Sequence, residues 1–198
     1  MDILKQIYPA FALTVVLTVL LGIIYPLAST GLAQLIFPRQ AAGSLIEKNG
    51  KIIGSSLIGQ TFSGPGYFHS RPSGAGRGYD AAASSGTNLG PTSRKLFEMN
   101  VRTAAEALRE ENPNTPIPVD LVTASSSGLD PHITPAAAEF QVSRVSSERD
   151  LSADDVRRLV RQHTEGRTFG LLGEPRVNVL ELNLALDSVR PMPGAGPR

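Results

Sequence analysis

The N-terminal part of the chain contains a long apolar segment without a charged side chain. Lys5 and Arg39 bracket this segment, and Leu, Val and Ile dominate it from Ile7 to Ala28. A helix that crosses the hydrocarbon core of a membrane needs about 20 apolar residues. We therefore predict a transmembrane helix over residues 7–28, with Pro9 in its first turn and Pro26 at its end.

Two other structures can produce an apolar segment near an N-terminus. A cleaved signal peptide has a shorter apolar core of about 7 to 15 residues and a small-x-small cleavage site, which Ala28-Ser29-Thr30 matches poorly. A buried helix of a soluble hairpin usually retains a polar face, which this segment lacks. The membrane helix is therefore favoured. Charge barely separates the two flanks, but long domains cross membranes largely regardless of charge, and we prefer the domain outside the cytoplasm.

Alternating and turn-forming residues predict strands at both ends of the remaining sequence. Asn49-Gly50 lies between the short apolar runs Leu45-Ile46 and Ile52-Ile53, which is a strong signal for a two-residue hairpin. Near the C-terminus, leucines alternate with other residues from Leu180 to Asp187, and this period of two predicts a strand.

Helical periodicity and capping residues predict three helices between those strands. The apolar residues of Thr92–Asn112 recur every three or four positions, and Pro113 stops the helix. Thr134 followed by Pro135 predicts a shorter helix through about Gln141. Ser152-Ala153-Asp154-Asp155 is typical of a capping box, and the helix that it begins places His163 on an apolar face.

A segment rich in Gly, Ser and Pro, residues 59–91, predicts an ordered loop, because aromatic residues recur along it. Together these elements predict one loop-rich α+β domain over residues 43–190. A short tail, residues 1–6, precedes the membrane helix, a connector, residues 29–42, follows it, and residues 191–198 form a disordered tail.

Composition narrows the possible functions. The formal net charge of +1 provides no broad field for nucleic acid, and the absence of cysteine excludes disulfides, thiolate nucleophiles and sulfur-ligated zinc. No phosphate-binding loop motif is present, so independent nucleotide hydrolysis is not expected.

A polar segment, Thr123–His132, raises the possibility of a membrane-anchored hydrolase outside the cytoplasm. Ser127, Asp130 and His132 are the residue types of a catalytic triad. Their spacing argues against one, because triad members normally converge from distant segments. The alternative is an Asx turn at Asp130-Pro131, with serine hydroxyls bonded to the backbone.

The histidines also raise the possibility of a metal site. His163 and Glu165 have the H-x-E spacing of zinc deaminases, but that site requires cysteines, so we predict no metal. A hydrogen-bonded histidine that packs on the apolar face of a helix is a better interpretation of His163 than a metal ligand. Asp130 and Glu174 could attract a cation, although structural roles are favoured for both.

Several longer motifs resemble one family, the C subunits of the Kdp potassium-transporting ATPases. They are G-Q-T-F from Gly59, Y-F-H-S-R-P-S from Tyr67, N-L-G-P from Asn88, S-G-L-D-P-H-I from Ser127, Q-V-S-R-V from Gln141, H-T-E-G-R from His163 and G-E-P-R-V-N-V from Gly173. They follow the family's order from the apolar segment to Asp187. Asp80, Ser85, Ser126 and Thr134 depart from the family pattern, which puts only local loop geometry in doubt.

The resemblance implies a non-catalytic accessory subunit of a high-affinity potassium uptake complex in the bacterial inner membrane. Its implied partners are a channel-like potassium-binding subunit, a P-type ATPase catalytic subunit and a small membrane subunit. ATP and potassium are used by the complex, with no cofactor tightly bound to this chain. The family is described as a catalytic chaperone that raises the ATP affinity of the ATPase subunit.

An extracytoplasmic domain could influence ATP only indirectly, through the complex. If the domain instead contacts nucleotide, Gln141 and Arg144 are the first residues to test. A free-standing structural or receptor protein is a third alternative. The family motifs contain these residues with expected structural or partner-contacting roles: Gln60, Phe62, Tyr67, Phe68, Arg71, Pro72, Asn88, Gly90, Pro91, Asp130, Pro131, His132, His163, Glu165, Arg167, Glu174, Arg176 and Asn178.

Overall fold

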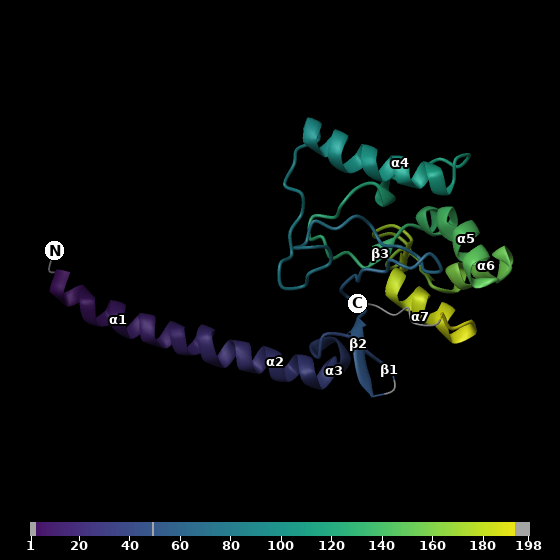
Figure 1. Cartoon of the computed structure of the whole chain (residues 1–198). Coiled ribbons are helices and arrows are strands. Elements are labelled where there is room, and N and C mark those ends of the chain that lie inside the picture. The colour runs from purple at the N-terminus through teal and green to yellow at the C-terminus, as the bar shows by residue number, and fades with distance from the viewer. Residues whose placement is uncertain (1–2, 49, 193–198) are drawn as a thin grey trace. The chain divides into compact units, whose positions relative to one another are not determined.

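The computed structural model describes residues 3–48 and 50–192, which fall into two compact units, Met1–Leu45 and Ile46–Arg198. The first unit is almost entirely helical (Figure 1). Helix α1 (Ile3–Val19), a π-helical segment (Leu20–Ile24) and α2 (Tyr25–Ile36) follow one another without a break, and the short α3 (Pro38–Ala41) comes next.

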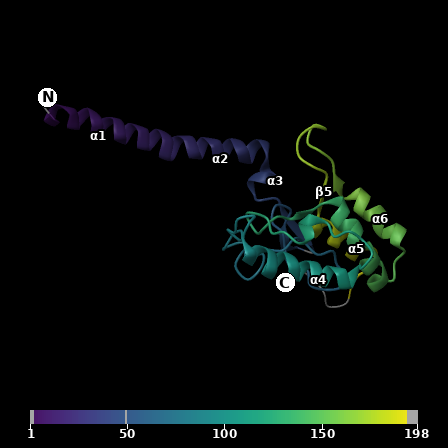
Figure 2. The same ribbon diagram turned by 90° about the horizontal axis from the view of Figure 1, so that it is seen from above.

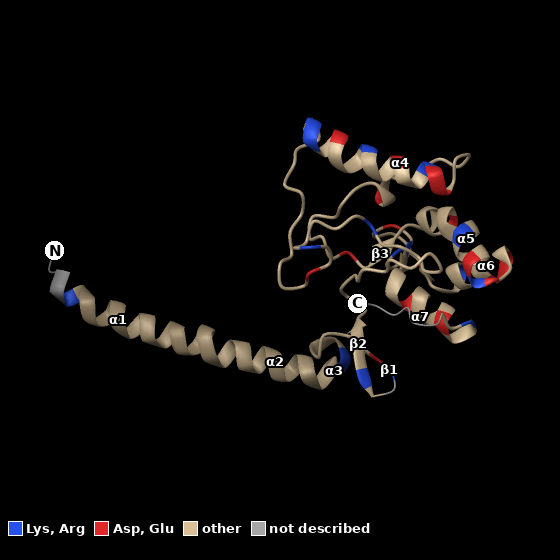
Figure 3. Ribbon diagram, in the orientation of Figure 1, with Lys and Arg blue, Asp and Glu red and all other residues tan. Residues whose placement is uncertain are grey.

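The long helix is the candidate membrane span of the structure. It covers Lys5–Ile36, with a mean hydropathy of 2.4, and none of its most apolar window is buried. From Gln6 onwards it carries no charged side chain (Figure 3). A buried hairpin helix would bury this surface against a core, so that alternative does not describe the unit.

The two prolines do not act as the sequence predicted. Helix α1 begins at Ile3, so Pro9 lies inside the helix and not in its first turn. Pro26 does not end the helix, which continues to Ile36. A π-helical turn directly precedes Pro26, with the Tyr25 N–H donating to the Leu20 carbonyl, and this wider turn accommodates a residue that has no N–H.

The predicted hairpin opens the second unit. Strand β1 (Leu45–Lys48) pairs with β2 (Lys51–Ser55), and Gly50 has the positive φ of 74° that such a turn requires. Asn49, the other turn residue of the prediction, lies outside the described residues. The hairpin is thus confirmed for the described part of the segment.

A second small sheet consists of three short strands that the sequence did not reveal. Strands β3 (His132–Ile133), β4 (Thr164–Glu165) and β5 (Arg176–Asn178) are antiparallel, in the order β3-β5-β4. His132 lies opposite Asn178, and Thr164 lies opposite Val177. The sheet therefore joins three segments that carry polar motif residues.

The helix predicted over Thr92–Asn112 is confirmed as a π-helical segment (Leu96–Val101) that continues into α4 (Arg102–Glu111). It ends before Asn112-Pro113, as expected for a residue that precedes proline. A 3-10 turn (Val119–Leu121) follows. Leu108 of α4 packs against the core, whereas Phe97 is exposed.

Helices α5 (Pro135–Arg149) and α6 (Ala153–Gln162) begin at the predicted caps. The Thr134 side chain accepts a hydrogen bond from the Ala137 N–H, and Ser152 accepts one from the Asp155 N–H. The end predicted for α5 near Gln141 is wrong, because buried residues recur at helical spacing as far as Arg149. The two helices lie side by side in both views (Figures 1 and 2).

The strand predicted over Leu180–Asp187 is wrong, because this segment is helix α7 (Val179–Val189). Asn178 caps it by accepting from the Glu181 N–H. Leu, Ala and Glu favour helices, and the segment is buried around much of its circumference, so apolar residues no longer follow a single helical stripe. The alternating leucines therefore do not mark the two faces of a strand.

The core lies among α5, α6, α7 and β5, and the ordered loop packs onto it through Phe62, Tyr67 and Phe68. Met192 also packs against this core, so the predicted disordered tail does not begin at Pro191. The rest of that tail, residues 193–198, lies outside the described residues. Helices and small antiparallel sheets together confirm the predicted α+β class.

Candidate functional site

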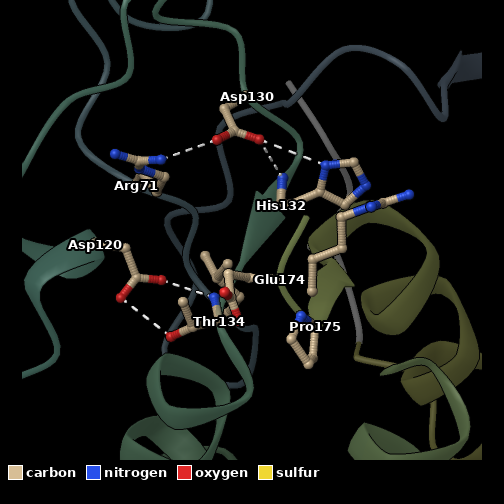
Figure 4. A pocket seen from close by; sticks show the side chains of 9 residues that line it. Arg71, Asp120, Asp130, His132, Thr134, Glu174 and Pro175 are labelled. Atoms are coloured by element: carbon tan, nitrogen blue, oxygen red, sulfur yellow. Dashed lines mark hydrogen bonds and ion pairs between the residues drawn. The ribbon is translucent and has the colours of Figure 1, made fainter. Parts of the chain in front are cut away.

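Polar motif residues converge on a pocket of about 210 Å³ beside the three-stranded sheet (Figure 4). Strand β3, the turn before it and the segment leading into β5 supply most of its wall, and the ordered loop supplies Arg71. The lining residues are Arg71, Asp120, Asp130, His132, Ile133, Thr134, Glu174, Pro175 and Arg176.

Asp130 lies at the centre of the hydrogen bonds on one side of the pocket. Its Oδ2 accepts from Arg71 Nη1 at 3.0 Å, and its Oδ1 accepts from the His132 backbone N–H at 3.0 Å and lies 3.5 Å from His132 Nδ1 (Figure 4). The bond to the backbone two residues later is the predicted Asx turn, which is confirmed. Ser127 Oγ likewise accepts from the Leu129 N–H at 3.2 Å.

These contacts keep the Asp130 carboxylate charged. Burial raises the pKa of Asp130, but the hydrogen bonds from His132 and the charge of Arg71 outweigh burial and hold this pKa below its ordinary value. The carboxylate therefore remains an acceptor at neutral pH, and Arg71 stays tied to it. Arg71 Nε also donates to the Thr123 carbonyl at 3.3 Å, so the pair joins two loops.

Asp120 is a pocket residue that the sequence reasoning missed. Its buried carboxylate accepts from the Thr134 N–H at 2.7 Å and from Thr134 Oγ1 at 3.2 Å, and Thr134 in turn caps α5. An aspartate between Pro118 and Leu121 gives no capping signal, because the helix that it supports begins 15 residues later. Only the tertiary fold brings the two together.

The opposite side of the pocket leads into a loop, residues 166–175, that is closed at its base by two ion pairs. Arg176 lies 2.7 Å from Glu165 across β4 and β5, and Arg167 contacts both Glu174 carboxylate oxygens at 2.8 Å. These four motif residues therefore pair with one another at the base of the loop. Because Glu174 pairs with Arg167 and Asp130 pairs with Arg71, neither carboxylate presents an uncompensated charge to a cation.

Gln141 and Arg144 lie away from this pocket and fasten the ordered loop to α5. The buried Gln141 amide accepts from the His69 N–H at 2.8 Å and donates to the His69 carbonyl at 3.1 Å. Arg144 donates to the carbonyls of Pro65 and Tyr67 and pairs with Glu111 at 2.9 Å. A nucleotide bound to either side chain would have to displace these contacts.

The remaining motif residues divide between core and surface. Phe62, Tyr67, Phe68 and Pro131 are buried. Pro72 lines a cavity of about 290 Å³ together with Leu96 and Asn100 of the π-helical segment Leu96–Val101. The Gln60 amide donates to the Ile53 carbonyl at 3.0 Å. Asn178 donates to the Ser56 carbonyl at 2.8 Å. Asn88, Gly90 and Pro91 are exposed in the loop before α4.

The residues of the hydrolase hypothesis do not form a nucleophile and base. Ser127 Oγ faces Ser125 Oγ and the Leu129 N–H, whereas the His132 ring faces Asp130. His163 Nδ1 lies 3.1 Å from the Leu159 carbonyl, which agrees with its interpretation as a packing histidine. Within residues 3–48 and 50–192, no cluster of three or more His, Asp or Glu side chains could hold a metal ion.

These features define a class of protein with one candidate membrane helix and one α+β domain, in which motif side chains bind one another and the backbone. A family model described as "K+-transporting ATPase, c chain" matches residues 7–188. The chain therefore belongs to the KdpC family, the C subunits of potassium-transporting ATPases.

Similar proteins cover almost the whole chain. One from Koribacter versatilis is 59% identical over 189 residues, with 96% of this chain and 97% of the relative covered. Others are from Acidobacterium capsulatum, 57% identical (94% and 100% covered), and Rhodopseudomonas palustris, 56% identical (93% and 98% covered). Each of these relatives carries the name potassium-transporting ATPase KdpC subunit.

Proposed function

We propose that the chain is a non-catalytic accessory subunit of an ATP-driven, high-affinity potassium uptake complex. It assists assembly and raises the ATP affinity of the ATPase subunit indirectly. The observation that carries this proposal is how the polar motif residues are used. Asp130, Gln141 and Arg144 form hydrogen bonds to other segments of the chain, and these bonds stabilise the fold of the domain. A catalytic role would require a nucleophile next to a base, and Ser127 and His132 do not meet.

In this proposal the chain lies in the bacterial inner membrane, with residues 46–192 outside the cytoplasm. Its partners are the channel-like potassium-binding subunit, the P-type catalytic subunit and the small membrane subunit. ATP is bound on the other side of the membrane, so the effect on ATP is a coupling free energy transmitted through these partners. Coupling is reciprocal, and ATP must therefore tighten the association of this chain by the same factor.

The direct test compares ATP affinity in complexes prepared with and without the chain. We expect the apparent dissociation constant for ATP to be about 5- to 150-fold lower with the chain present, which is the usual range for allosteric coupling. The association of the chain with the other subunits, measured with and without ATP, should change by an equal factor. Equal ATP affinity in both preparations would refute the indirect activation.

The placement of the domain has a separate test. A reporter that is active only outside the cytoplasmic membrane should function when fused after Arg198, and a reporter that is active only in the cytoplasm should not. Fusion at this end leaves Asp187 and Met192 in place, both of which contact the core region. The opposite pattern of reporter activity would place the domain inside and make direct contact with ATP possible.

A further inference from the structure

The loop of residues 166–175 presents three large apolar side chains to solvent. Phe169 is 90% exposed, Leu171 is 81% exposed and Leu172 is 62% exposed. The loop extends from β4 and β5 away from the packed helices (Figure 2). We refer to Phe169, Leu171 and Leu172 as the apolar tip. Since these three side chains leave most of their surface exposed, they contribute little hydrophobic stabilisation to the fold.

The backbone of the tip forms a hydrogen-bonded turn. Thr168 N–H donates to the Leu172 carbonyl at 2.8 Å, and the Leu171 and Leu172 N–H groups donate to the Thr168 carbonyl at 3.2 and 3.0 Å. Below this turn, Arg167 binds both oxygens of Glu174. The backbone bonds limit the conformations of the turn, which reduces the backbone entropy lost on binding.

The conformation of Phe169 is also unfavourable for its residue type. Phe169 and Gly170 have positive φ values of 54° and 75°, a combination for which turns favour Asn-Gly or Gly-Gly. A bulky residue with positive φ is strained, and here no burial of the ring compensates for it. Strain retained at an exposed position points to a role outside the folding of this chain.

Charge at the base of the tip distinguishes between a lipid surface and a protein as its binding partner. Arg167 is neutralised by Glu174, and Arg176 is neutralised by Glu165, so this base has no net positive charge to attract anionic lipid. An apolar centre surrounded by paired charges is instead the usual arrangement of a protein interface, with an anchor inside a polar rim. The pocket lined by Glu174, Pro175 and Arg176 adjoins this rim (Figure 4).

We propose that the apolar tip is a docking anchor that inserts into an apolar depression on another subunit of the same potassium-transporting ATPase. The inference rests on membership of the complex and does not depend on how ATP affinity is changed. A complex could lose the effect on ATP and still contain this contact. The two proposals can therefore fail separately.

The experiment is photo-crosslinking of the full chain in membranes that contain the whole complex. A photoreactive phenylalanine analogue replaces Phe169 in one preparation and Leu57 in another, because Leu57 is an exposed apolar residue of the same domain. We expect position 169 to crosslink to another subunit of the pump, at least tenfold more strongly than position 57. Crosslinks to lipid alone, to a second copy of this chain or to nothing would overturn the proposal.

A second measurement tests the energetic role of the tip. The double variant Phe169→Asn/Leu171→Gln removes the anchor, and Asn suits the positive φ at position 169, so the domain should fold at least as well. We expect its retention with the other subunits in detergent to fall about tenfold, with Leu57→Gln unchanged. Equal retention of both variants would contradict the docking role.

Discussion

The long helix and the ordered loop stabilise their backbones in opposite ways. Helix residues 5–36 satisfy their N–H and C=O groups internally and leave nearly every side chain exposed. Residues 56–93 form neither strand nor helix, yet Tyr67, Phe68 and Ala75 in this segment are fully buried. Regular backbone and burial are thus independent properties, and each region needs only one of them.

The loop can be buried because side chains of the helices replace the missing backbone partners. Asn183 of α7 bonds both the N–H and the C=O of Phe68 at 2.9 Å, and Gln141 of α5 does the same for His69. Buried backbone groups without partners would be costly, and these amides remove that cost. A membrane helix needs no such support from neighbours, because its backbone bonds lie within the segment.

Charged residues placed in the long helix should have the largest effect, because nearly all of its side chains are exposed. Val16→Arg combined with Leu20→Arg should cost about 2.5 to 3.5 kcal/mol for each substitution on membrane insertion. The chain should then leave the membrane fraction and fail to copurify with other subunits. Val16→Leu with Leu20→Val is the control and should insert normally. Normal membrane retention of the arginine variant would show that residues 5–36 are not a membrane span.

A buried charge in the domain gives the next largest effect. Arg149 is fully buried, donates to the carbonyls of Gly66 and Arg190, pairs with Asp187 at 3.0 Å and lies 4.5 Å from the Tyr67 ring centroid. Arg149→Met should lower the free energy of unfolding by about 3 to 5 kcal/mol, because Asp187 keeps the Tyr67 hydroxyl as a donor but loses its positively charged partner. Denaturant unfolding of the full chain in detergent would measure it.

The matched control for Arg149 is the exposed Arg158, which pairs with Asp155 at 2.9 Å. Arg158→Met should change stability by less than about 1 kcal/mol, as is usual for surface ion pairs. Similar losses in the two variants would mean that burial does not determine the contribution of these arginines.

Features encoded by neighbouring residues could be predicted from the sequence. The Asn49-Gly50 hairpin, the caps at Thr134 and Ser152, and the end of α4 before Pro113 all depend on interactions within a few positions. The apolar helix was equally clear, since its composition alone defines it. Pro26 misled the prediction because its effect depends on whether the preceding turn can widen.

Features that depend on contacts between distant segments could not be predicted. Burial on several sides of α7 imposed a misleading alternation of leucines, and the buried Gln141, Ser146 and Arg149 interrupted the apolar period of α5. The family motifs contain seven of the nine pocket residues but not Asp120, whose partner Thr134 lies 14 positions away. Phe169 belonged to none of the quoted motifs, and only its exposure and positive φ mark it.

The amide support of the loop is tested by Gln141→Met, which keeps the side chain at a similar size. Without the amide, the His69 N–H and C=O lose their partners, and the free energy of unfolding should fall by about 2 to 3 kcal/mol. Gln162→Met, at an exposed position of α6, should be nearly neutral. Reduced ATP affinity with unchanged unfolding would instead assign Gln141 to nucleotide contact.

The smallest expected effect is the pH dependence that His69 gives to the buried loop. Burial and the nearby charge of Arg144 lower the pKa of His69, so the folded chain favours the neutral ring, which lies 3.1 Å from the Gly64 carbonyl. The unfolded chain binds a proton near the ordinary pKa of about 6.5, and stability is therefore complete above this pH and falls below it.

Denaturant midpoints at pH 7.5 and pH 5.5 should therefore differ more in the parent chain than in His69→Gln, which cannot titrate. The amide of Gln can still donate a hydrogen bond. The difference between the midpoints of the parent chain and of His69→Gln at pH 7.5 therefore reports the change in packing alone. At pH 5.5 the same difference also includes the effect of protonating His69. His163→Gln, at a half-buried position at the end of α6, should preserve the difference. An equal acid loss in the parent chain and in His69→Gln would show that the loop is not held by a neutral histidine.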